Sequence, residues 1–199
     1  MLNLTELINL LINALSIILT IYIFEGLKGL ISTALGDTTP KTRGWLTLNP
    51  FKFFEPIGFF MFLFYGFGWG HSTETSSMNY KNRKQGTLMT YGLPIVLSFV
   101  LGVAIIKLIG FVELNLNYYV TVLLKYLGFH LINIAVFNII PLTPMAGSKI
   151  IKLYLSPNAA LRFSQNEKLY QMMFMFLWFV GIVPNILSFV VTQLVLILL

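Results

Sequence analysis

Apolar residues run along this chain in long, nearly uncharged stretches rather than in the amphipathic patterns of soluble domains. A helix that crosses a bilayer needs about 20 largely apolar residues. The last of four such stretches, Leu169–Leu199, is longer than one span needs. Gly and Pro within its Gly181–Asn185 segment predict a kink or a break. It fits one bent helix or a hairpin of two short helices. The four stretches are Leu7–Leu35, Thr87–Val112, Tyr118–Ile140 and Leu169–Leu199.

A fifth apolar stretch, Ile57–Trp69, is only 13 residues long and contains three glycines. Such a short run is typical of a re-entrant or interfacial segment. If it crossed the membrane, its basic flanks would face opposite sides, against the positive-inside bias. We therefore predict that it enters the membrane and returns, with both flanks in the cytoplasm. The flanking basic residues are Lys41, Arg43 and Lys52 before it, and Lys81, Arg83 and Lys84 after it.

This topology places the amino terminus and the Glu113–Asn117 loop outside the cell. The sequence thus predicts an all-α polytopic membrane protein with four to six membrane segments, one re-entrant element and a short extended stretch. Residues 1–199 are expected to form a single membrane domain, with a core at about 7–155 and a C-terminal membrane segment at 169–199. The basic residues of the last polar segment, expected in the cytoplasm, are Lys149, Lys152, Arg162 and Lys168.

Composition supports a membrane protein. Hydrophobic residues make up 57% of the chain and charged residues 10%, whereas soluble domains carry roughly 25% charged residues. The net charge of +6 is small enough to be loop charge. Binding of nucleic acid would require these charges on one solvated face, so we expect membrane lipids and no nucleic acid as partners. Cysteine is absent, which excludes disulfides, thiolate metal sites and cysteine nucleophiles.

Three segments contain combinations of Gly, Pro, Asn and charged residues that are unusual in simple membrane-spanning sequence. The first reads GDTTP from Gly36, followed by GWLTLNPFK from Gly44 and EPIG from Glu55; the second begins GWGH at Gly68, and the third is FNIIPLTPMAG from Phe137. In order and spacing they resemble the site-2 protease family of intramembrane zinc metalloproteases, in its compact bacterial and archaeal form. The corresponding family segments are GDPT, GRLTLNP, HIDPIG, GWAKPVPVN and FNLIPIPPLDG.

The resemblance implies which residues would form the zinc site. In that family, both histidines of HExxH and the aspartate of the DG motif bind zinc, and the HExxH glutamate is the general base. Here Phe24 and Lys28 stand at the histidine positions and Ala146 at the aspartate position, while Glu25 matches the general base. Phe and Ala offer a metal no lone pair, and a lysine cation repels it. We therefore expect no zinc cofactor, no intact metal ligands and no protease activity.

The two histidines do not replace these ligands in the sequence. His71 falls where the family has the lysine of GWAK, on a loop, and both a solvated residue and a ligand fit that position. His130 lies in the outer half of its helix, far from the expected site. We predict that His130 forms a hydrogen bond to a neighbouring helix.

Glu25 and Lys28 allow two interpretations. Charged residues within a membrane segment indicate function by default, so the pair can contact a partner. Because they are three residues apart on one helix face, they can also pair with each other and fill the emptied metal site. In that case the Lys28 ammonium serves as the cation that Glu25 faces.

A peptide-accepting groove can persist without cleavage. In the family, the asparagine and prolines of the third segment shape an unwound helix end beside the substrate-binding edge; here they can instead only terminate the helix. The extended stretch at residues 46–48 is able to accept a peptide by strand addition. An open and a closed groove are both compatible with the sequence. The candidate groove residues are Leu46, Thr47, Leu48, Asn138, Pro141, Pro144 and Gly147.

Together these features predict a catalytically inactive homologue of an intramembrane zinc metalloprotease. It would bind or scaffold another membrane protein, or its transmembrane helix, as a regulator or complex subunit. The bias of the composition towards Ile, Asn, Lys and Phe is typical of proteins from prokaryotes with AT-rich genomes, so we expect a prokaryotic cell membrane. One alternative is an active metalloprotease with unorthodox ligands, and another is a structural subunit of a larger complex. Transport is the weakest alternative, because paired discontinuous helices are not evident.

Overall fold

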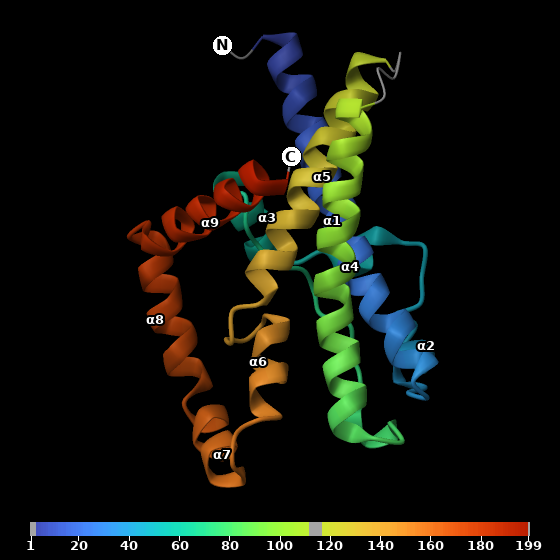
Figure 1. Ribbon diagram of the computed structural model, residues 1–199, viewed down its shortest axis with the longest axis vertical. Coiled ribbons are helices and arrows are strands. Elements are labelled where there is room, and N and C mark those ends of the chain that lie inside the picture. Colours follow the sequence, from blue (N-terminus) through green and yellow to red (C-terminus); the bar gives the residue numbers. More distant parts are fainter. Residues whose placement is uncertain (1–2, 112–116, 199) are drawn as a thin grey trace.

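The computed structural model describes residues 3–111 and 117–198, which are largely helical with no strand among them (Figure 1). Three helices, α1 (Leu4–Ala34), α4 (Arg83–Phe111) and α5 (Tyr118–Asn138), are long and apolar enough to cross a membrane. The all-α polytopic prediction is confirmed. Counting α8 and α9 together as one broken span gives four, the lower end of the predicted four to six.

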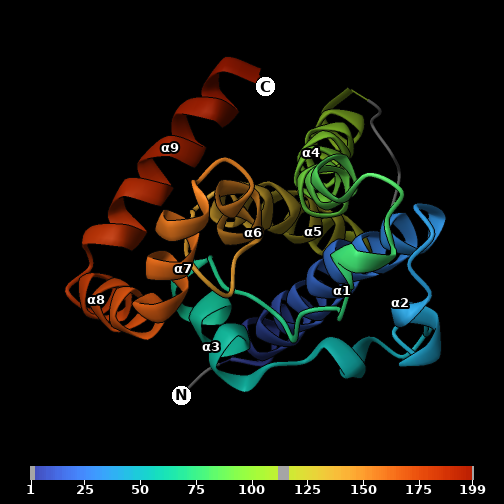
Figure 2. The ribbon, with the colours of Figure 1, turned by 90° about the horizontal axis from the view of Figure 1, so that it is seen from below.

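Shorter elements connect and flank these helices. Figure 2, viewed from below, shows α8 and α9 set apart from the group formed by α1, α4 and α5. Between α1 and α4 lie α2 (Thr39–Thr42), η1 (Pro50–Phe53), α3 (Pro56–Tyr65) and η2 (Ser77–Asn79). After α5 come α6 (Ala146–Lys152), α7 (Pro157–Gln165), α8 (Glu167–Phe179) and α9 (Ile182–Leu198).

The chain around α3 folds back on itself. The returning backbone passes so close that a Cβ on Gly58 would collide with the carbonyl oxygen of Trp69. The N–H of His71 then donates to the carbonyl of Phe53 at 2.8 Å. Because the two ends of the segment meet, it enters and leaves on the same side of the fold, which is the course that a re-entrant segment requires.

The predicted break in the last apolar stretch is confirmed. Gly181 adopts a φ of 88°, a left-handed conformation that glycine accepts without steric cost. Here α8 ends and α9 begins, and the two helices meet at 74°. Figure 1 shows α9 turned across the direction of α8. The stretch is therefore two helices at an open angle, neither a gently bent span nor a closed antiparallel hairpin.

Helix ends differ from the predicted spans by a few residues. Asn3 and Glu6 form a capping box, which starts α1 before its apolar run. At the other end of the bundle, α4 begins at Arg83, because the polar residues before the second span continue the helix. The predicted end of that span at Val112, and most of the Glu113–Asn117 loop, lie outside the described residues. The predicted extended stretch at residues 46–48 is irregular chain, neither helix nor strand.

Candidate functional site

One face of α1 presents the residues at the first two expected ligand positions. Phe24, Glu25 and Lys28 are 1%, 5% and 1% exposed. Residues 24 and 28 are one helical turn apart, so their side chains lie above each other on the same face. This helical spacing is what two histidines in HExxH would use to bind one metal.

Lys28 and Glu25 form a closed ion pair. The Lys28 Nζ lies 2.7 Å from Oε1 and 2.8 Å from Oε2 of Glu25, and it donates a third hydrogen bond to the hydroxyl of Ser72 at 3.0 Å. The same ammonium lies 5.4 Å from the ring centre of Phe24 and 5.5 Å from that of Tyr91. All three ammonium hydrogens thus have acceptors, and the two aromatic faces attract the ammonium charge.

Ala146 lies with Phe24 in one apolar cluster. It is the first residue of α6, and its N–H donates to Oδ1 of Asn138 at 3.0 Å. The Asn138 amide in turn donates to the carbonyl of Ile134 at 2.9 Å, so Asn138 fixes the turn that carries Ala146. The cluster comprises Ile17, Ile21, Phe24, Trp45, Phe53, Phe62, Ile134 and Ala146. The structure therefore brings the predicted ligand positions on α1 and α6 together.

The residues at this site do not fit zinc. A phenyl ring, a methyl group and an ammonium ion replace the three expected donors, and Glu25 alone remains as a carboxylate. Structural and catalytic zinc sites use at least three protein ligands of the N, O or S type. Among the described residues, no group of three or more His, Cys, Asp or Glu side chains is placed to hold a metal ion.

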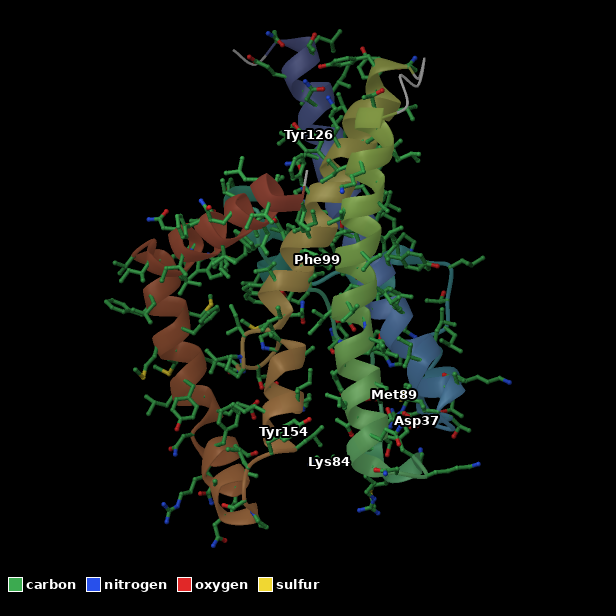
Figure 3. The ribbon with its side chains drawn as sticks, viewed as in Figure 1. Asp37, Lys84, Met89, Phe99, Tyr126 and Tyr154 are labelled. Atoms are coloured by element: carbon green, nitrogen blue, oxygen red, sulfur yellow. The ribbon has the colours of Figure 1, made fainter. Side chains whose placement is uncertain are left out.

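The histidines lie away from a common centre. The His71 side chain is exposed, and its ring stacks on Trp45 with ring centres 5.3 Å apart. His130 is buried in α5, and its Nε2 lies 2.7 Å from Oδ1 of Asn13 on α1, the interhelical hydrogen bond that the sequence predicts. Tyr126, which stacks on His130, lies towards the opposite end of the bundle from Asp37 (Figure 3).

Asp37 has the buried, hydrogen-bonded surroundings typical of a functional residue, although its sequence context did not predict a role for it. It is fully buried, and its carboxylate accepts hydrogen bonds from Ser32 Oγ, Thr39 N–H, Ser76 N–H and Asn79 Nδ2 at 2.7–3.0 Å. Burial by itself would raise the pKa of Asp37, but the hydrogen bonds from Thr39, Ser76 and Asn79 outweigh it and lower the pKa from 3.8 to about 2. The one feature of the sequence that points to Asp37 is its position in the GDTTP segment.

A second unpredicted feature is the extended chain before η2. The Thr73 N–H donates to Oε2 of Glu25 at 2.7 Å, and the Thr73 hydroxyl donates to the Glu25 carbonyl at 2.9 Å. Thr73 is 2% exposed. Residues 72–76, which we call the 72–76 segment, therefore lie directly against the carboxylate that matches the family's general base.

The candidate groove residues have different surroundings. Asn138 and Gly147 are buried beside Ala146, whereas Pro141 and Pro144 are exposed. Leu46 packs near Gly29 of α1, and Leu48 is 92% exposed. Asn138 and Gly147 thus shape the site itself, while a groove that also includes residues 46–48 stays a prediction.

Comparison with known proteins gives one informative relative. The chain is 26% identical over 160 residues to a Bacillus subtilis (strain 168) protein described as "Putative zinc metalloprotease YwhC", a match that covers 77% of this chain and 73% of the relative. No protein family profile matches the chain, and no solved structure matches it. The similarity supports a site-2-protease-like family for this integral membrane protein.

Proposed function

We propose that this chain is a catalytically inactive relative of intramembrane zinc metalloproteases that binds or scaffolds another membrane protein. The observation that carries the proposal is the Lys28 ammonium, which lies within 2.8 Å of both Glu25 oxygens. It stands one turn from Phe24, at a position where the resemblance implies a zinc ligand.

Glu25 is not arranged to act as a general base. A base must lie within hydrogen-bond reach of the water whose proton it takes. Both Glu25 oxygens already accept hydrogen bonds from Lys28, and Oε2 also accepts the Thr73 N–H. Without a metal, a water at this site keeps a pKa near that of bulk water. The carboxylate is therefore better suited to holding the fold together than to hydrolysis.

Polypeptide binding is the part of a protease's function that needs no metal. The described chain has three long apolar helices, α1, α4 and α5, and the turn from Asn138 to Ala146 is ordered by hydrogen bonds. A transmembrane helix of another protein is the partner class that such a frame would meet in a bilayer. We place the site and the basic loops on the cytoplasmic side of a prokaryotic cell membrane, in line with the charge distribution.

Metal content tests the proposal directly. The full chain, purified in mild detergent and dialysed against metal-free buffer, is expected to contain near-zero zinc per chain. The Bacillus relative, if it retains intact HExxH and DG motifs, serves as the control and is expected to contain about one zinc per chain. Stoichiometric zinc that is lost in Glu25→Gln or His71→Ala would overturn the proposal in favour of an active protease with unorthodox ligands.

Cleavage and partner assays complete the test. Single-span substrates that are cleaved by a metalloprotease with intact HExxH and DG motifs should remain intact with this chain at equal concentration. A partner held at fixed stoichiometry through purification would favour a complex subunit, and a transient cross-linked partner would favour a regulator. Cleavage of such a substrate by this chain would contradict inactivity whatever its zinc content.

A further inference from the structure

We infer that the emptied metal site is a binding site for extended peptide backbone, and that the chain fills it with its own 72–76 segment. This inference deepens the proposed function and rests on it.

Two buried carboxylates hold the segment at its two ends. Oε2 of Glu25 accepts the N–H of Thr73 at 2.7 Å, and Oδ2 of Asp37 accepts the N–H of Ser76 at 2.7 Å. Glu25 is 5% exposed and Asp37 is 0% exposed. Hydrogen bonds to charged acceptors in water-excluded surroundings are the strong ones, so both ends of the segment are firmly attached.

Side-chain hydroxyls add contacts between these anchors. The Ser72 hydroxyl accepts from Lys28 at 3.0 Å, and the Thr73 hydroxyl donates to the Glu25 carbonyl at 2.9 Å. The Thr75 hydroxyl lies 2.9 Å from that of Tyr91 on α4. The segment is thereby tied to α1 and α4 together.

The chemistry of these contacts identifies the kind of ligand. Both carboxylates accept backbone N–H groups, which every residue except proline carries. The side chains that enter are small and hydroxylated. A site built in this way recognises an extended backbone with small polar side chains rather than a particular sequence.

The segment also closes the site. An incoming peptide would have to take the hydrogen bonds that Thr73 now makes to Glu25, and Lys28 would lose Ser72. A partner that reached the site would therefore displace the 72–76 segment first. We assign the described arrangement to the closed state.

The absence of cysteine from the chain makes the closure measurable. The full-length Gly29→Cys variant, in detergent, carries one thiol on α1 against the segment, because a Cβ at this buried glycine lies 3.3 Å from Cγ2 of Thr73. This thiol should react slowly with a charged maleimide. Adding Thr73→Pro removes the N–H that Glu25 Oε2 accepts and also the hydroxyl that donates to the Glu25 carbonyl. The reaction should then accelerate by at least about 10- to 100-fold, the factor that corresponds to losing the hydrogen bond to the charged carboxylate alone.

Two controls are matched to this experiment. Glu74→Pro introduces proline at the next position of the segment. Among the described residues, the Glu74 N–H donates no hydrogen bond, so this change should accelerate the reaction far less. Gly26→Cys places a thiol on α1 where a Cβ has open space, and its rate should not respond to Thr73→Pro. A folded Gly29→Cys/Thr73→Pro variant whose thiol reacts no faster than that of Gly29→Cys alone would overturn the inference.

Hydrogen exchange on the unmodified chain gives a second test that does not depend on how well the variants fold. The Thr73 and Ser76 amides should exchange more slowly than the Glu74 amide by about 10-fold or more. Equal exchange at all three amides would overturn the inference. Near-zero zinc with unprotected amides would leave the proposed function standing without its internal ligand, whereas stoichiometric zinc would overturn the proposed function itself.

Discussion

The Lys28 ammonium lies within hydrogen-bond distance of both carboxylate oxygens of Glu25, and the two side chains are 2% and 7% exposed. They stand three residues apart on a helix long and apolar enough to cross a membrane. Removing either charge alone would leave the other buried without its partner, which costs far more than the net stabilisation that such a pair provides. The pair therefore behaves as one unit.

Lys28→Met is accordingly expected to destabilise the fold by about 3–5 kcal/mol. The double variant Glu25→Leu/Lys28→Met should recover most of that loss, because it leaves no unpaired charge. The measurement is the free energy of unfolding in mixed detergent micelles. Lys107→Met, on the exposed surface of α4, is the control and should change stability by about 0.5 kcal/mol or less. Equal destabilisation in the single and double variants would show that the two charges are not coupled.

Stability should depend on pH through Asp37. Its pKa in the folded protein is about 2 against 3.8 unperturbed, so the ionised form favours folding. The corresponding stabilisation, about 2 kcal/mol, is present above about pH 4 and is lost as the pH falls towards 2. Unfolding free energies measured between pH 2 and 5 should show this slope in the natural chain and a smaller slope in Asp37→Asn. Parallel slopes in the two proteins would contradict the assignment.

The helical frame was predictable because it depends on local properties of the chain. Length and continuity of apolar sequence identify α1, α4 and α5, and Gly181 with Pro184 marks the break between α8 and α9. The short, glycine-containing run before Trp69 indicates a return, since it cannot cover the thickness of a bilayer. Capping residues such as Asn3 shift helix ends by a few positions without altering the order of elements.

The content of the site was only partly predictable, because it depends on contacts between distant residues. Pairing of Glu25 with Lys28 follows from helical spacing. The Thr73 contact to Glu25 spans 48 positions and the Asn79 contact to Asp37 spans 42. No periodicity in an irregular loop specifies which carboxylate its backbone meets. Only the folded arrangement of α1 against the 72–76 segment shows it.

Close packing of α4 on α5 depends on Gly102. A Cβ at this position would lie 2.6 Å from the carbonyl oxygen of Gly128, so α4 would have to move away. Small residues at helix contacts let backbones approach in this way in membranes. Gly102→Ala should destabilise the protein by about 1–3 kcal/mol through overpacking. Gly110 lies on the same helix, and a Cβ added there has nothing within 4 Å. Gly110→Ala is therefore the control and should be neutral or stabilising. Similar unfolding free energies for the two variants would exclude a packing role for Gly102.

Placing zinc ligands at the three positions where the resemblance implies them should create metal binding. Phe24 and Ala146 already belong to one buried cluster, and residue 28 lies one turn from residue 24 on the same face. The triple variant Phe24→His/Lys28→His/Ala146→Asp should therefore bind about one zinc per chain, because three donors then converge on one point.

The matched control for this variant is Phe24→His/Lys28→His, which keeps Ala146 and leaves two histidines without the carboxylate from α6. It should bind zinc more weakly, and isothermal titration of both proteins against zinc measures the difference. Equal affinity would mean that position 146 does not face the two histidines. Absence of zinc from a folded triple variant would mean that the backbone of this chain does not hold the three positions at ligand distance.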